Sequence, residues 1–309
     1  MSASSKKTVL ITGCTAGGIG AALAKEFHSR GFRVFAVSRK LETMKELPAI
    51  GIETLALDVT DIDAIRKTKE EISRRTDGKL DILVNNAPVG DAAVADLDME
   101  VVRALYELNV FAPMCMVQEF LPLLIASGKG CVVNNGSVAG IMPIPFTAAY
   151  NSSKAALHSF GDTLRLELAP FNVRVVNLIT GAVNTNILQP YIDNPAEFFP
   201  ENSLYKSMEE ERQAQIRNSS STYVFRNYTP ANPVPFTETA ISAADFARTV
   251  VGAVTKSSPP RAVWAGANAR DGWLIDTFLP RSTVDWVMAN MFGMLKLAAR
   301  VRSEKSKHT

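Results

Sequence analysis

Cysteine is scarce in this sequence, and its charges nearly cancel. The 309 residues include three cysteines, Cys14, Cys115 and Cys131, whose spacing fits no metal-binding motif. So few cysteines exclude a disulfide-based scaffold and indicate reduced thiols in an intracellular protein. The formal net charge is +2, which gives no electrostatic reason to expect a nucleic-acid partner.

Long hydrophobic runs are also missing. No stretch of 18 or more consecutive apolar residues occurs, so we expect no membrane-spanning helix. The opening MSASSKKTVLITG passes from a short polar leader directly into a strand-like run, which leaves no room for the apolar region of a secretory signal. The residues are 47% hydrophobic and 21% charged. This is the composition of a globular protein with a sizeable core, in one large domain or two ordinary ones.

Apolar, β-branched runs alternate with amphipathic stretches over the first 180 residues. Strands are predicted at 8–13, 33–38, 53–59, 80–86, 130–137 and 173–179, and helices at 19–29, 61–76, 98–126 and 148–169, with a short helix at 41–47 that Pro48 ends. Such runs indicate strands buried on both faces, and their alternation with helices indicates a parallel sheet. We therefore predict an α/β fold, a doubly wound parallel sheet of the Rossmann type.

Two irregular segments follow. Residues 186–235 contain six prolines around the charged, helix-like stretch SMEEERQAQIR, and a connector of this length predicts a lid on the substrate side. A helix near 242–256 and a strand at 261–266 are expected to complete the sheet. We assign 1–270 to one domain that includes the lid, and 271–309 to an amphipathic C-terminal extension.

The segment TGCTAGGIG, residues 12–20, lies where the first strand turns into the first helix. Glycines permit positive φ and close backbone approach, and the free N–H groups of a helix N-terminus bind a pyrophosphate. Such a loop can also be a plain tight turn, but its place after the first strand of a βαβ unit favours dinucleotide binding.

The end of the second strand indicates which dinucleotide binds. A carboxylate there would accept a hydrogen bond from the ribose 2′-hydroxyl of NAD, but this sequence has Ser38 followed by Arg39 and Lys40. A hydroxyl and a guanidinium suit a 2′-phosphate, which favours NADP(H); the alternative is that Arg39 is a solvated charge at a helix start. Asp58, which ends the third strand, is expected either to accept from the adenine amino group or to cap a helix.

Further motifs accompany the glycine loop in a fixed order. They are Asn85-Asn86-Ala87 after the fourth strand, Asn109 in the long helix, Ser137 after the fifth strand, and the pair Tyr150 and Lys154 in AAYNSSKAAL. Over residues 7–185 this set resembles the short-chain dehydrogenase/reductase family.

The resemblance implies a role for each catalytic residue. Tyr150 matches the general acid/base, and Lys154 matches the lysine that lowers the tyrosine pKa and holds the nicotinamide ribose. Ser137 matches the serine that orients the substrate carbonyl, and Asn109 the asparagine that supports a water leading to the lysine. Free tyrosine titrates near pKa ~10. A fixed ammonium and a cationic nicotinamide favour its phenolate, while a serine hydroxyl stabilises a developing alkoxide.

The same resemblance implies NADP(H) as the cofactor and no metal. The expected cofactor-binding residues are Gly13, Thr15, Gly18, Ile19, Gly20, Ser38, Arg39, Asp58, Asn86, Tyr150, Lys154, Val183 and Thr185.

The sequence departs from the family pattern at a few positions. Gly17 beside Gly18 makes the glycine loop one residue longer than usual, and Thr180-Gly181 stands where Pro-Gly is common. Pro88 replaces a usual glycine; because proline lacks an N–H and fixes φ, we expect the wall near the nicotinamide to differ. His158 shares a helix face with Lys154 by spacing, and we interpret it as a packed or surface imidazole rather than a catalytic one.

The loop form, the sequence NVFAPM, the long insertion and the aromatic tail resemble a fungal subgroup of the family. That subgroup includes NADPH-dependent acyl-dihydroxyacetone-phosphate reductases and 17β-hydroxysteroid-dehydrogenase-like enzymes. The resemblance implies reduction of an apolar ketone, in lipid, steroid or secondary metabolism, to a secondary alcohol. The alternatives are NADP-dependent alcohol oxidation at the same site, or a repurposed isomerase, cyclase or binding role without redox turnover.

The basic end of the tail fits an amphipathic helix on a membrane surface. Packing over the substrate mouth, or contact within a homo-oligomer, is the slightly favoured explanation of its composition. We accordingly expect an intracellular protein, either cytoplasmic or peripheral on the endoplasmic reticulum or a lipid droplet.

Overall fold

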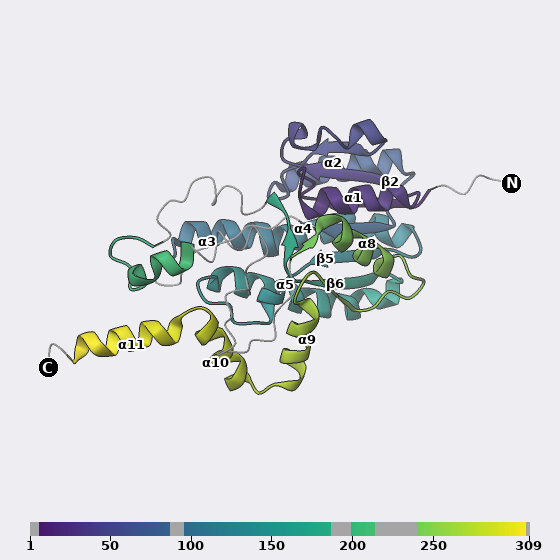
Figure 1. The fold of residues 1–309 in the computed structure, drawn as a ribbon. Helices are drawn as coiled ribbons and strands as arrows, with labels where there is room; N and C mark the ends of the chain where they lie inside the picture. The colour runs from purple at the N-terminus through teal and green to yellow at the C-terminus, as the bar shows by residue number, and fades with distance from the viewer. Residues whose placement is uncertain (1–5, 87–95, 187–198, 214–239, 307–309) are drawn as a thin grey trace.

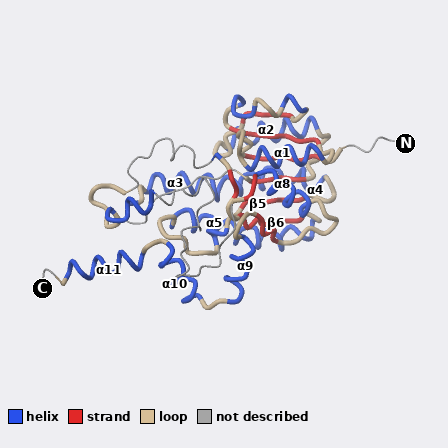
Figure 2. The backbone as a smooth tube through the Cα atoms, viewed as in Figure 1, coloured by secondary structure: helices blue, strands red, loops and turns tan. Residues whose placement is uncertain are grey.

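The computed structural model describes residues 6–86, 96–186, 199–213 and 240–306. Within them, parallel strands form one seven-stranded sheet in the order β3-β2-β1-β4-β5-β6-β9 (Figure 2). The strands of this sheet are β1 (Thr8–Thr12), β2 (Arg33–Ser38), β3 (Glu53–Ala56), β4 (Ile82–Asn85), β5 (Cys131–Asn135), β6 (Arg174–Thr180) and β9 (Ala262–Ala265). A separate short parallel pair is made by β7 (Val183–Asn184) and β8 (Ile241–Ser242).

Helices cover both faces of the sheet (Figure 1). The helices are α1 (Ile19–Ser29), α2 (Ile62–Arg75), α3 (Met99–Tyr106), α4 (Ala112–Ala126), α5 (Ala148–Leu168), α8 (Ala243–Val254), α9 (Ala269–Phe278), α10 (Arg281–Met291) and α11 (Met294–Lys305). On one face, Val9 and Ile11 of β1 pack in a core cluster with α1 and α8. On the other face, Leu10 packs in a cluster with α2, α4 and α5. Alternate residues of one strand thus enter opposite cores, and the predicted doubly wound fold is confirmed.

Two predicted elements differ in detail. The predicted helix at 41–47 is a short 3₁₀ turn, Leu41–Met44, and Pro48 begins a second 3₁₀ turn, Pro48–Ile50, instead of ending a helix. Proline suits the first position of a turn, because its N–H would be unpaired there in any case. The third strand, predicted over 53–59, ends at Ala56.

The predicted helix at 98–126 has a wider turn at its centre. Glu107–Phe111 forms a π-helical turn between α3 and α4. Pro113 follows two residues later and lacks the N–H that a regular helix would direct to the Asn109 carbonyl, so the hydrogen-bond pattern shifts at this point. By length and composition Met99–Ala126 could cross a membrane, but half of its most apolar window is buried. Its apolar side chains, such as Phe120 and Leu124, pack against the sheet.

The C-terminal helices form a third apolar cluster away from the sheet. Ile275 of α9, Met288 of α10 and Phe292 pack there with Phe146, which precedes α5, and with Phe199. In Figure 1, α11 then runs outward from the body toward the C-terminus. Of the predicted lid, 187–198 and 214–235 lie outside the described residues; within SMEEERQAQIR, residues 209–213 are helical.

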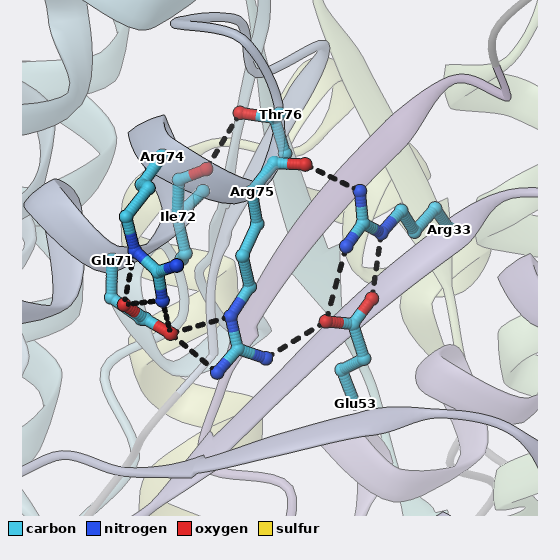
Figure 3. Close-up of polar contacts among 7 residues, drawn as sticks. All are labelled: Arg33, Glu53, Glu71, Ile72, Arg74, Arg75 and Thr76. Atoms are coloured by element: carbon cyan, nitrogen blue, oxygen red, sulfur yellow. Dashed lines mark hydrogen bonds and ion pairs between the residues drawn. The ribbon is translucent and has the colours of Figure 1, made fainter.

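A network of ion pairs joins the amino ends of β2 and β3 to the end of α2 (Figure 3). Glu53 accepts from Arg33 Nε at 2.6 Å and from Arg75 Nη1 at 2.9 Å. Partial burial by itself raises the pKa of Glu53, but the hydrogen bonds from the two arginines outweigh it and lower the pKa. The network lies at the sheet edge opposite the carboxyl ends of the strands, so it stabilises the fold and leaves the other edge for ligands.

Candidate active site

A cavity of about 850 Å³ opens at the carboxyl ends of the central strands. This edge of a doubly wound sheet is where ligands bind in such folds. The cavity brings together nine of the expected cofactor-binding residues: Gly13, Thr15, Gly18, Ile19, Ser38, Arg39, Asp58, Asn86 and Thr185.

The glycine loop has the backbone form that the sequence predicts. Gly13 and Gly17 have φ of 71° and 74°, a region that glycine adopts at little cost. A Cβ on Gly20 would strike the carbonyl oxygen of Gly13, so the first turn of α1 and the end of β1 approach as closely as they do only because Gly20 has no side chain. Gly18 precedes α1 with no side-chain cap. The first N–H groups of the helix are therefore left for a ligand.

Arg39 and Asp58 line the same cavity at the ends of neighbouring strands. Asp58 Oδ1 accepts from the N–H of Thr60 at 3.0 Å and from its hydroxyl at 2.7 Å. The backbone bond is the main cause that lowers the pKa of Asp58, and the charge of Arg39 adds to it. The helix-cap alternative for Asp58 is wrong, because Asp61 caps α2 through the N–H groups of Asp63 and Ala64.

Behind the glycine loop, a chain of buried amides crosses the sheet. Thr180 donates to Asn135 Oδ1 at 2.6 Å, and Asn135 Nδ2 donates to Asn86 Oδ1 at 2.8 Å. Asn86 Nδ2 in turn donates to the carbonyls of Thr12 and Gly13 at 2.9 and 3.2 Å. Because three of these bonds are buried and the one to Gly13 is partly buried, the chain fixes the ends of β1, β4, β5 and β6 relative to one another.

Lys154 lies deep beside this network. Its side chain is buried, and Nζ donates to the carbonyl of Asn135 at 2.8 Å. The same nitrogen lies 5.6 Å from the centre of the Tyr150 ring, one helical turn earlier in α5. Burial lowers the pKa of Lys154 to about 8, so at neutral pH the amine still carries a charge next to the phenol.

Ser137 and Asn109 approach α5 from two sides. The N–H of Ser137 donates to His158 Nε2 at 3.2 Å, and its Oγ accepts from the N–H of Ala139 at 3.1 Å. Asn109, buried in the π-helical turn, donates through Nδ2 to the Ser153 hydroxyl at 3.0 Å. All four residues of the expected tetrad thus lie on α5 or are hydrogen-bonded to it.

Some expected residues lie away from the cavity wall. Gly20 acts through backbone contact, Val183 pairs with Ile241 in the β7–β8 ladder, and Tyr150 and Lys154 do not line the cavity. Pro88, which we expected to reshape the nicotinamide wall, lies outside the described residues.

Other wall residues were missed from the sequence. They are Ala16, Leu57, Val59, Thr60, Val101, Ala104, Leu105, Glu107, Leu108 and Asn186. The α3 members recur at helical spacing, a signal that was present, but such a stripe in a sequence is indistinguishable from an ordinary core face. Asn186 is placed by the fold, which lays its side chain against Gly17.

Comparisons with known proteins agree with this geometry. The sequence profile of the short chain dehydrogenase family matches residues 7–196. A short-chain dehydrogenase, srdE, of Neurospora crassa is 37% identical over 298 residues, which cover 96% of each chain. An NADPH-dependent 1-acyldihydroxyacetone phosphate reductase of Schizosaccharomyces pombe is 45% identical over 202 residues, covering 65% of this chain and 68% of that protein.

A solved structure supports the same assignment. The crystal structure of a short-chain dehydrogenase from Streptomyces avermitilis superposes with a TM-score of 0.71 at 26% identity, over 97% of this chain and 99% of that one. The fold, the cavity at the strand ends and the family profile all lead to one conclusion, which confirms the expectation from the motifs: the chain belongs to the short-chain dehydrogenase family of oxidoreductases.

Proposed function

We propose that this protein is an NADPH-dependent carbonyl reductase that converts an apolar ketone to a secondary alcohol. The observation that carries the proposal is the position of the buried Lys154 amine, 5.6 Å from the Tyr150 ring centre on the same helix. A tyrosine next to a fixed ammonium is a general acid/base, because the charge stabilises its phenolate.

The cavity supports NADP(H) as the cofactor. It extends from the glycine loop, where Gly20 permits close backbone approach, to Arg39 and Asp58 at the strand ends. Arg39 is an exposed residue on the wall, and the end of β2, Ser38-Arg39-Lys40, has no acidic residue of the kind that would select NAD. The Schizosaccharomyces pombe relative is NADPH-dependent. The residues that would hold the group are the glycine loop, Ser38, Arg39, Asp58 and Asn86, together with Val183 and Thr185 after β6.

Each residue of the tetrad has one task in this reaction. When bound, NADPH supplies the hydride. Tyr150 donates its phenolic proton to the carbonyl oxygen, and Lys154 stabilises the phenolate that remains. Ser137 donates a hydrogen bond to the same oxygen as negative charge develops on it. Asn109 joins the π-helical turn to α5 through its hydrogen bond to Ser153. In this position it supports the water path by which Tyr150 regains its proton.

We propose that the apolar segment that precedes α5 contributes to an apolar substrate site. This segment, IMPIPF at 141–146, contains buried Met142 and Phe146 next to the C-terminal helices. Phe146 has a φ of 66°, an uncommon conformation for a bulky residue that often marks a functional region.

A panel of ketones tests the proposal. Lipid, steroid and polyketide ketones are incubated with NADPH, and the loss of nicotinamide absorbance is followed. Turnover of at least one apolar ketone is expected, faster than turnover of small polar ketones. Oxidation of the product alcohol with NADP⁺ should occur at the same site, since the direction depends on the cofactor ratio. NADPH binding without turnover of any ketone or alcohol would instead favour a non-redox role.

We further propose that residues 271–309 form an extension to the dehydrogenase domain, 1–270, and bring the protein to a membrane surface such as the endoplasmic reticulum or a lipid droplet. Trp273, Phe278 and Trp286 are exposed on α9 and α10. Beyond them α11 carries Lys296, Arg300, Arg302 and Lys305. Exposed aromatic residues next to cations suit an anionic lipid interface. The alternative is that these exposed aromatic side chains contact a second copy of the chain in a homo-oligomer.

A further inference from the structure

His158 does more than fill space in α5. Its Nε2 accepts a hydrogen bond from the backbone N–H of Ser137 at 3.2 Å, across 21 residues of sequence. An Nε2 that accepts carries no proton, so the ring is the neutral tautomer with its hydrogen on Nδ1.

Two glycines make room for the imidazole. A Cβ on Gly136 would strike Nε2 and Cδ2 of His158, and a Cβ on Gly140 would lie 2.8 Å from Cε1. Both flank the Ser137 turn, so the backbone on either side of Ser137 lies directly against the ring. A packed surface residue would not need glycine at both positions.

This contact completes the fixation of Ser137. Its backbone N–H is held by His158, and its Oγ already accepts from the N–H of Ala139 at 3.1 Å. Because the Ser137 Oγ accepts this bond through a lone pair, its hydroxyl hydrogen remains available to donate to a substrate. A serine that orients a carbonyl and stabilises its developing charge needs this arrangement.

We propose that His158 is a positioning residue, which holds the Ser137 backbone so that the Ser137 hydroxyl keeps the geometry of a donor to the substrate oxygen. The inference rests on the proposed reductase function. His158 itself touches neither substrate nor cofactor in this account.

Substitutions of His158 separate the effect of its hydrogen-bond acceptor from the effect of its packing. His158→Leu removes the acceptor, while His158→Gln can offer its amide oxygen to the same N–H. We expect kcat to fall about 10- to 100-fold in H158L, with KM and the NADPH dissociation constant within about twofold of wild type and kcat largely restored in H158Q. His28→Leu, which changes a partly buried histidine in α1, is the matched control and should retain full kcat. Should H158L fold poorly by circular dichroism, His158→Phe keeps a planar ring without an acceptor.

A second readout does not depend on turnover. Amide hydrogen exchange of the segment 131–141 should accelerate in H158L and return toward wild type in H158Q. If kcat and exchange in H158L match wild type, or if H158Q loses as much as H158L, the proposal is overturned. If the wild type binds NADPH but reduces no ketone, the proposed reductase function is contradicted and the role of His158 is not. Amide exchange of segment 131–141 in the variants then still tests whether His158 holds the Ser137 backbone.

Discussion

The chemistry that we propose for this protein depends on a few charges and hydrogen bonds around α5. Lys154 has its amine at the Asn135 carbonyl and beside the Tyr150 ring, and burial keeps its pKa at about 8. Its charge therefore responds to pH above neutrality, where loss of the proton would remove the stabilisation of a Tyr150 phenolate. At the other end of the site, Arg39 is the residue on which cofactor choice is expected to depend.

Removing the phenol tests the acid/base role most directly. Tyr150→Phe should lower kcat about 10²- to 10⁴-fold, because the proton donor is lost, while the NADPH dissociation constant stays near that of wild type. Tyr106→Phe is a matched control: Tyr106 donates to the Ser152 hydroxyl at 2.8 Å on the same helix, yet we assign it no proton transfer. Steady-state kinetics that show equal turnover for Y150F and wild type would contradict the assignment.

Replacing the arginine at the end of β2 tests cofactor selection. Arg39→Ala should weaken NADPH binding about 10- to 100-fold, the effect of losing charge-assisted hydrogen bonds, and should leave NADH binding unchanged. Lys40→Ala, a neighbouring cation that does not line the cavity, should cost much less. Titration calorimetry distinguishes these outcomes, and a wild type that binds NADPH and NADH equally would remove the basis of the assignment.

The partly buried imidazole of His158 gives stability a specific pH dependence. Burial, helped by the Lys154 charge, lowers the pKa of His158 to about 4, whereas in the unfolded chain it titrates near ~6.5. Between these values only the unfolded state takes up this proton, so the free energy of unfolding falls as pH drops from 6.5 to 4.

Lys154 and Asp162 lie one turn before and one turn after His158 on α5, and the neutral Asn177 of β6 donates to the His158 carbonyl and to Asp162 Oδ1. In urea unfolding, the wild type should lose stability relative to H158L over this pH range, by on the order of 1–3 kcal/mol. A difference that stays constant with pH would show that His158 titrates normally.

Among the elements, the helix from Met99 to Ala126 does two jobs. Its first part, α3, supplies Val101, Ala104 and Leu105 to the cavity wall, and its last part, α4, packs in the core. The π-helical turn between them turns Asn109 toward α5. At the opposite edge of the sheet, the Arg33–Glu53–Arg75 network holds β2, β3 and α2 together (Figure 3).

Glu53 is the shared acceptor of that network, so its removal should loosen all three elements. Glu53→Gln should lower the free energy of unfolding by about 1 kcal/mol, since the pairs are partly exposed, and less so in high salt. Glu100→Gln breaks the more exposed Glu100–Arg103 pair and should change stability by under ~0.5 kcal/mol. Urea titrations at two salt concentrations measure the free energy of unfolding of both variants. Equal losses in Glu53→Gln and Glu100→Gln would show that the network adds no stability beyond that of an exposed ion pair.

At the scale of the whole molecule, the C-terminal helices join a folded region to a projecting one. Ile275, Met288 and Phe292 are buried against Phe146 and Phe199, so α9 and α10 belong to the body near the site. The start of α11 still contacts the body, because Met294 and Leu297 pack against the same cluster and Arg300 pairs with Glu211 at 2.8 Å. The rest of α11 extends outward (Figure 1).

Two truncations separate these regions. Deleting 294–309 should leave the sheet and NADPH binding intact but reduce binding to anionic liposomes, because the cations of α11 are lost. Deleting 271–309 should also lower the melting temperature, because it exposes Phe146 and its neighbours to water. Co-sedimentation with vesicles and thermal unfolding measure both effects, and a light-scattering mass that drops from dimer to monomer without any liposome binding would favour the oligomer role instead.

Much of the site follows from short-range sequence. The parallel sheet with helices on both faces could be inferred because strands buried on both faces have a recognisable apolar pattern. The glycine loop could be inferred because glycine readily adopts the positive φ found at Gly13. The pairing of Tyr150 with Lys154 follows from the helical period, which places residues four apart on one face.

Other features depend on contacts between distant segments, which no local pattern specifies. The bond from Ser137 to His158 exists because α5 packs beneath the turn that follows β5, with Gly136 and Gly140 opening the space. The burial of the tail on Phe146 likewise requires the folded body as its partner. Sequence by itself determined the family and predicted the cofactor loop and the reacting residues, since these depend on residue type and spacing. Only the tertiary structure decided what holds those residues in place, because that depends on which surfaces meet when apolar area is buried.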